Sequence, residues 1–207
     1  MRDVQVLHRR LSDDVAGLGL ADDPGARGLI GRLRDEADHK YRELLIVLRS
    51  DRYLDLIEQL REQLAQPKLR PDAPHRGARK LVRTPWAKLR RAVETLPSSP
   101  ADTELHAVRI RAKRCRYAAE AAGKQAGHRA SQLAAACTDL QDALGEHQDA
   151  VVAQRWLSGI VPQLTPGEAF VAGQLRAVQQ HEAAIARAAW PEAWHEVNKK
   201  RFRRWLA

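Results

Sequence analysis

A helical pattern of apolar residues extends through almost the whole chain, and this feature restricts the fold more than any other. Apolar side chains recur at spacings of three and four, whereas no stretch alternates apolar and polar residues with a period of two. Aromatic residues make up only 5% of the chain, and Ala, Leu, Arg and Glu are abundant, which favours helix over strand. The sequence therefore predicts an all-α fold.

Glycine and proline divide this pattern into separate expected helices. Pro85 is expected to kink or restart one helix, and Gly145 is expected to end another, with Asp149 as the N-cap of the next. Residues 165–168 read Thr-Pro-Gly-Glu, the pattern of a capping box with proline at the first helical position, and Pro191 is expected to open the last helix. The expected helices are 2–18, 26–49, 51–65, 77–96, 103–123, 129–144, 149–160, 166–190 and 191 onward.

Two parts of the chain resemble each other, which indicates an internal duplication. Residues 2–11 match residues 148–157, and a glycine, leucine, arginine and histidine within 31–39 recur within 173–181. We expect a first repeat at about 1–66, a proline-rich linker at about 66–76 and a second repeat at about 77–207. The second repeat contains a basic helix without a counterpart in the first, so the first repeat is expected to lack its initial basic helix.

Positive charge is concentrated in one region. The formal net charge is +9, and residues 76–117 carry twelve Lys and Arg against three Asp and Glu. The remaining residues hold 23 basic and 23 acidic side chains and are balanced. A concentrated positive field attracts polyanions. The alternative interpretation is a pair of arginine-rich helices that are simply solvated.

The cysteines and the remaining composition indicate a cytoplasmic protein. Cys115 and Cys137 each fall on an apolar helical face, as buried thiols of a reducing compartment do. The first residues are charged where a signal peptide needs an apolar run, and no segment has the apolar length of a membrane span. Paired Cys and His ligand spacing is absent from the sequence, so we expect neither a metal nor another cofactor.

Residues 105–120 form the most informative helix. On a helical projection His106, Arg109, Lys113 and Arg116 lie within an arc of about 80° beside an apolar stripe. Like charges at these spacings repel one another, and an external anion would neutralise them. Arginine donates two parallel hydrogen bonds to phosphate, and a polymeric phosphate suits a row of donors. We call these four residues the His106 row. The apolar stripe consists of Leu105, Val108, Ala112, Cys115 and Ala119.

A second basic group precedes the His106 row. Its residues share about a third of a helical circumference if the helix continues through Pro85. They are candidate phosphate ligands, and the alternative is a solvated outer face. The group consists of Arg76, Arg79, Lys80, Arg83, Arg90 and Arg91.

The residues of these helices resemble the CHAD family, the conserved histidine α-helical domains. Leu-His-x-x-Arg-Ile-x-x-Lys-Arg-x-Arg-Tyr-x-x-Glu at 105–120 resembles the signature helix of that family, and Leu-Gln-Asp-x-Leu-Gly-x-x-x-Asp at 140–149 is similar to a second marker. Leu-Arg-Ser-Asp-Arg-Tyr at 48–53 is similar to the family's junction between two later helices. The resemblance implies two similar antiparallel helical bundles around a basic surface or channel.

The resemblance also implies non-catalytic binding of inorganic polyphosphate and association with polyphosphate granules. The implied contacts are the His106 row, with Arg114 as a further candidate. Catalysis is not expected, because the string Glu-His-Gln-Asp at 146–149 lacks the adjacent His-Asp pair of helical metal-dependent phosphohydrolases.

Two other functions fit the composition. Nucleic acid is the alternative polyanion, because phosphate contacts are shared, but the basic region offers only Trp86 and Tyr117 for stacking. The basic C-terminal segment adds Phe202 and Trp205, although amphipathic terminal helices have the same composition. The other alternative is a structural granule or scaffold protein. An incomplete first repeat would leave apolar surface uncovered, so self-association is also expected.

Overall fold

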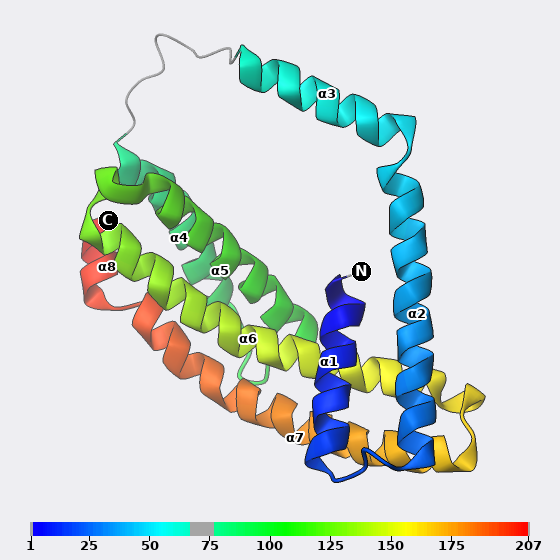
Figure 1. Cartoon of the computed structure of the whole chain (residues 1–207). Helices are drawn as coiled ribbons and strands as arrows, with labels where there is room; N and C mark the ends of the chain where they lie inside the picture. Colours follow the sequence, from blue (N-terminus) through cyan, green and yellow to red (C-terminus); the bar gives the residue numbers. More distant parts are fainter. Residues whose placement is uncertain (1, 67–76, 207) are drawn as a thin grey trace. The chain divides into compact units, whose positions relative to one another are not determined.

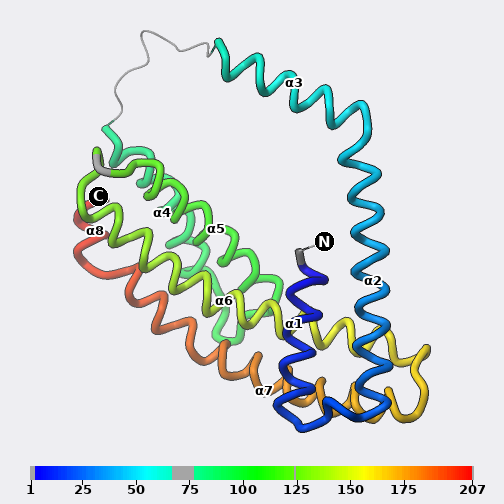
Figure 2. Tube along the Cα trace, in the orientation of Figure 1, coloured from blue at the N-terminus to red at the C-terminus, as the bar shows by residue number. Residues whose placement is uncertain are grey.

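The computed structural model describes residues 2–66 and 77–206, and all regular structure within these ranges is helical. The predicted all-α fold is confirmed, and most of the expected linker lies outside the described residues. Figure 1 shows the helices in chain order, and Figure 2 traces the backbone through them. The helices are α1 (Arg2–Gly17), α2 (Pro24–Leu48), α3 (Asp51–Ala65), α4 (Ala78–Glu94), α5 (Asp102–Ala122), α6 (His128–Ile160), α7 (Pro166–Val197) and α8 (Lys200–Leu206).

Contacts divide the chain into two compact units. The first contains residues 1–74 and 156–176, and the second contains residues 75–155 and 177–207. Helices α1 to α3 therefore belong to the first unit and α4, α5 and α8 to the second, while α6 and α7 contribute to both. The two repeats were inferred from sequence similarity rather than from contacts, and the duplication stays a prediction.

The second unit is built around one apolar core. Helices α4, α5 and α6 run side by side, and α8 packs on α4 (Figure 1). Every residue of the predicted apolar stripe on α5 is buried in this core, which confirms the predicted inward face. Cys115 and Cys137 are both free and buried, as expected. The neighbouring Cys115 thiol and burial hold the pKa of the Cys137 thiol well above its usual range.

The first unit buries apolar side chains of α1 and α2, and two helix starts approach each other closely within it. A Cβ added to Gly25 of α2 would lie 2.6 Å from the backbone of Gly167 in α7, so only glycine fits there. The expected capping box is present: the Thr165 amide donates to Glu168 Oε2 at 2.8 Å, and the Glu168 amide donates to Thr165 Oγ1 at 3.4 Å. Arg32 of α2 also donates to Glu168 Oε1 at 2.9 Å, which ties α2 to α7.

The new helix expected at Pro191 is wrong, and Pro85 does not restart a helix, although the kink expected there as the alternative stays a prediction. Helix α4 continues through Pro85, and α7 continues through Pro191 as far as Val197. A proline inside a helix costs about 3 kcal/mol through its lost hydrogen bond and its clash with the preceding turn. Tryptophans next to both prolines contribute to the core. Trp86, directly after Pro85, is buried in it, and Trp190 and Trp194, on either side of Pro191, pack against it. Their burial offsets the cost of the proline.

The break expected at Gly145 is also wrong. Helix α6 is continuous from His128 to Ile160, so Asp149 lies inside it and is not an N-cap. Gly145 is buried, and a Cβ there would lie 3.5 Å from Arg109 Nε. The glycine therefore marks the place where an arginine crosses the helix, rather than a helix end.

Candidate anion-binding surface

The His106 row lies along α5 on the flank next to α6. Its position follows from the buried stripe, because burying that stripe fixes the direction of the adjoining side chains. Arg109 crosses α6 at Gly145, where the missing side chain leaves room for the guanidinium group. Lys113 is exposed, and the other three members are partly buried. The structure therefore presents the predicted row as one face of a firmly packed helix.

The first turn of α5 is anchored by two other helices. Nε2 of His147 in α6 lies 3.0 Å from Asp102 Oδ1, and its Nδ1 lies 3.2 Å from the carbonyl oxygen of Ala183 in α7. Arg187 of α7 donates to Asp102 Oδ1 at 3.0 Å and also to the carbonyl of Pro100. Sequence reasoning missed this cluster, because Asp102 and His147 are 45 residues apart.

Three members of the His106 row have a buried nitrogen without a hydrogen-bond partner in the described part of the chain. These atoms are His106 Nδ1, Arg109 Nε and Arg116 Nε. Arg116 Nε lies 3.5 Å from Glu120 Oε1 in an ion pair, but it makes no hydrogen bond. A buried donor without an acceptor costs roughly 1–3 kcal/mol.

The predicted second group lies along α4, where most of its described members are exposed. Arg79, Lys80 and Arg83 are exposed along α4. Arg90 donates to Glu94 Oε1 at 2.8 Å, and its guanidinium carbon lies 5.5 Å from the centre of the Trp86 ring. Its charge is therefore partly neutralised by a neighbour on the same helix. Arg76 lies outside the described residues.

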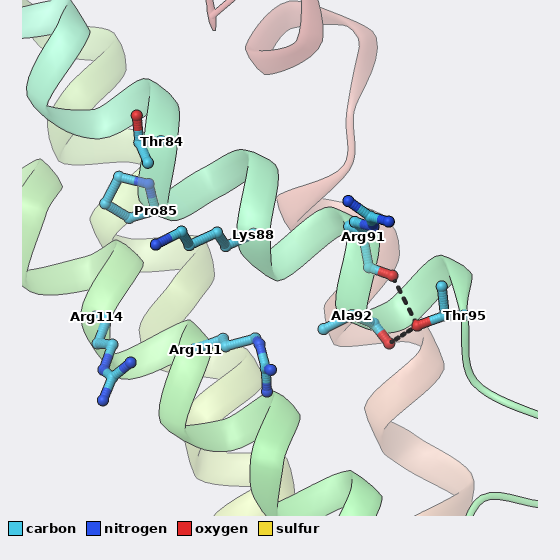
Figure 3. Close-up of a pocket in the computed structure, with 8 residues that line it drawn as sticks. All are labelled: Thr84, Pro85, Lys88, Arg91, Ala92, Thr95, Arg111 and Arg114. Atoms are coloured by element: carbon cyan, nitrogen blue, oxygen red, sulfur yellow. Dashed lines mark hydrogen bonds between the residues drawn. The ribbon is translucent and has the colours of Figure 1, made fainter.

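A basic pocket of about 570 Å³ lies between α4 and α5 (Figure 3). It brings together two predicted residues, Arg91 and Arg114, with two that the sequence interpretation did not select, Lys88 and Arg111. On a helical projection Arg111 lies on the opposite flank of α5 from Arg109. The packing of α4 against that flank adds Lys88 and Arg91 to the two arginines of α5, so spacing along α5 alone could not have identified the pocket. The remaining lining residues are Thr84, Pro85, Ala92 and Thr95.

Two other structural features are absent from the described residues. No group of three or more His, Cys, Asp or Glu side chains there is placed to hold a metal ion. None of the described helices combines the length and the apolar composition that crossing a membrane requires.

Comparison with known families matches residues 1–158 to the CHAD domain. The chain belongs to the CHAD family. This confirms the resemblance inferred from the motifs at 105–120 and 140–149.

Similar proteins come from two bacterial genera. The uncharacterized proteins MT2285 and Rv2226 of Mycobacterium tuberculosis, from strains CDC 1551 / Oshkosh and ATCC 25618 / H37Rv, are each 30% identical to this chain over 168 residues. The matched region is 75% of this chain and 31% of each relative, so the chain spans about a third of their length. In three dimensions the chain is similar to PptA from Streptomyces chartreusis, with a TM-score of 0.76 and 25% identity, covering 94% of this chain and 73% of that one.

Proposed function

We propose that this CHAD protein binds inorganic polyphosphate through the His106 row and does not catalyse a reaction on it. The observation that carries the proposal is the set of buried, unpartnered nitrogens on His106, Arg109 and Arg116. Membership of the CHAD family, together with the likeness to PptA, suggests the same ligand. A ligand with many acceptor oxygens suits the cationic side chains that carry these nitrogens.

The shape of the row suits a linear polymer. From His106 to Arg116 the row extends about 15 Å along the helix, at 1.5 Å per residue. A chain of phosphates lying along α5 would meet a new donor at about each turn of the helix. Lys113 Nζ and the guanidinium carbon of Arg116 lie 5.7 and 4.9 Å from the centre of the Tyr117 ring, which orders both side chains before the ligand arrives. Ordered cations lose less entropy on binding.

The aromatic residues give less support to nucleic acid as the ligand. Non-specific binding of single strands relies on exposed rings on which bases stack. Trp86, Phe202 and Trp205 are all buried in the core of the second unit. In residues 77–117 this leaves Tyr117, which already lies against two cations. The observations therefore favour a ligand that is read through its phosphates alone.

The proposal is tested by two variants that each remove three positive charges. The first combines Arg109→Ala, Lys113→Ala and Arg116→Ala, and the control combines Arg201→Ala, Arg203→Ala and Arg204→Ala, which are exposed residues of α8. A preorganised arginine stabilises the complex with phosphate by roughly 1–2 kcal/mol more than an unsupported surface charge does. We expect the first variant to lose at least about tenfold more affinity for long-chain polyphosphate than the control.

Calorimetric titration measures both affinities, and circular dichroism checks that both variants fold. The affinity of the wild type for polyphosphate should also fall steeply with salt concentration, because several Lys and Arg side chains displace counterions from the phosphates. Equal losses in the two variants would mean that net charge governs binding and would remove the assignment to the His106 row. Tighter binding of DNA than of polyphosphate in a competition titration would favour the nucleic-acid alternative.

A further inference from the structure

The pocket between α4 and α5 is chemically distinct from the His106 row. Lys88 and Arg91 reach it from α4, and Arg111 and Arg114 reach it from α5, on the flank opposite Arg109 (Figure 3). Four cationic side chains thus line one hollow, and no carboxylate lines it. Its volume of about 570 Å³ lies within the range of roughly 300–1,000 Å³ that is typical of small-molecule pockets.

The cations of this pocket have no counter-charge. Elsewhere on the same two helices, arginines pair with carboxylates, Arg90 with Glu94 and Arg116 with Glu120. The side chains of Lys88, Arg91 and Arg114 make no ion pair or hydrogen bond within the described residues, and the guanidinium group of Arg111 donates only to the backbone carbonyl of Ala107, at 3.1 Å. Like charges held this close repel one another, and an anion in the pocket relieves that repulsion.

We infer that this pocket is a separate binding site for a compact group of two or three linked phosphates. A terminal phosphate group carries about −1.5 to −2 charges near neutral pH and an inner one about −1, so two or three linked phosphates carry about −3 to −5, close to the charge of four cations. Arg111 and Arg114 line the pocket from α5, and Lys88 and Arg91 line it from α4, so each helix supplies charged donors. Thr84 adds a hydroxyl donor, whereas the Thr95 hydroxyl already donates to the backbone carbonyls of Arg91 and Ala92.

The site is independent of the proposed function. The His106 row is an open face along one helix and suits a long polymer, whereas the pocket is a hollow between two helices and suits a short ligand. Binding at one does not require binding at the other. The phosphates could belong to a short inorganic chain or to a nucleotide triphosphate, and the titration separates these sources.

The test uses sodium tripolyphosphate as the probe and calorimetric titration of the full chain. The pocket variant combines Lys88→Ala, Arg111→Ala and Arg114→Ala, and the control is again Arg201→Ala with Arg203→Ala and Arg204→Ala. We expect the pocket variant to lose at least about tenfold in affinity and the control to lose less than about twofold, because only the pocket variant removes converging donors. The His106-row variant is expected to retain tripolyphosphate binding while losing long-chain polyphosphate.

Two further measurements keep the inference testable if the pocket variant folds poorly. Arg111→Lys keeps the charge but removes the planar fork, and we expect it to lose about threefold. Amide shifts of the wild-type protein on addition of tripolyphosphate should change most within residues 84–95 and 111–114.

ATP is titrated in parallel to identify the source of the phosphates. An ATP affinity equal to that of tripolyphosphate means that only phosphates are recognised, and tighter ATP binding identifies a nucleotide.

The outcomes that overturn the inference are specific to the pocket. The inference is wrong if the pocket variant binds tripolyphosphate as tightly as the wild type, or if the control variant loses as much affinity as the pocket variant. It is also wrong if the amide shift changes are confined to the His106 row. Failure of the wild-type protein to bind long-chain polyphosphate would overturn the proposed function alone, since tripolyphosphate binding in the pocket is measured separately.

Discussion

Two amphipathic helices, one in each compact unit, reach opposite degrees of burial. Helix α8 of the second unit has only seven residues, yet Phe202, Trp205 and Leu206 are all buried in the core that α4 helps to build. Helix α3 of the first unit has 15 residues and none is buried. Leu64 of α3 is 78% exposed, and Ile46 near the end of α2 is 73% exposed. An amphipathic pattern therefore produces a buried face only where another element covers it.

The units also differ in what holds them together. The second unit has a continuous apolar core drawn from five helices. The first unit has buried apolar side chains of its own, among them Leu11, Leu29 and Leu157. It adds specific contacts at one end of α2, where Gly25 meets Gly167 and Arg32 meets Glu168. Lost apolar burial should therefore destabilise either unit, and the first unit should also be sensitive at these few specific contacts.

The largest expected effect comes from the core of the second unit. Phe202 is fully buried, and Phe202→Ala should lower the free energy of unfolding by about 3–5 kcal/mol, through lost burial and a residual cavity. Urea denaturation measures the change. A loss below about 1 kcal/mol would show that α8 packs no more firmly than α3, and the comparison between the units would fail.

The next largest effect is expected at the helix contact of the first unit. Gly25→Ala would place a methyl group 2.6 Å from the Gly167 backbone, and backbone can yield only by moving a helix. We expect a loss of about 1–3 kcal/mol. Gly31→Ala is the matched control, because a Cβ there meets nothing within 4 Å, and better helix propensity should stabilise that variant by up to about 1 kcal/mol. Thermal denaturation of both variants measures the difference between the two positions. A loss of stability in Gly31→Ala as large as that in Gly25→Ala would contradict the role of the close helix contact.

The ion pair of the first unit should give a pH-dependent effect. Hydrogen bonds from Arg32 and Thr165 lower the pKa of Glu168 to about 2, from an ordinary value of 4.5. A carboxyl with a depressed folded-state pKa stabilises the fold above its unfolded pKa, and this stabilisation is lost as the pH falls toward the folded value. The Tm difference between the wild type and Glu168→Gln should therefore be greatest above about pH 5 and shrink between about pH 4.5 and 2. A difference that does not vary with pH would contradict this.

The smallest effect is expected on the exposed face of α3. Leu56→Gln and Leu64→Gln should each change the free energy of unfolding by less than about 0.5 kcal/mol, because neither side chain is buried. A loss of more than about 2 kcal/mol would mean that this face is covered in solution. Light scattering of the wild type and the double variant would then test the sequence-based expectation of self-association.

Helical periodicity alone determined much of this protein. It predicted the all-α fold, the buried stripe of α5 and the burial of both cysteines, since these depend on local spacing and side-chain type. The motif from Leu105 to Glu120, taken together with the markers at 140–149 and 48–53, identified the family. The same projection put the four members of the His106 row on one face of α5, and in the structure Lys113 is exposed and the other three are partly buried. Their role as polyphosphate ligands stays a proposal.

Only the tertiary structure decided which helices continue and which cations meet. Gly145 and Pro191 look like helix ends locally, but burial on either side and the passage of Arg109 over Gly145 override that preference. Lys88 and Arg111 converge because α4 packs on α5, a contact between residues far apart in the chain. The exposure of α3 likewise depends on what lies against it. Local spacing encodes the direction of a side chain along its own helix, whereas its neighbours are set by the packing of other helices, which spacing does not encode.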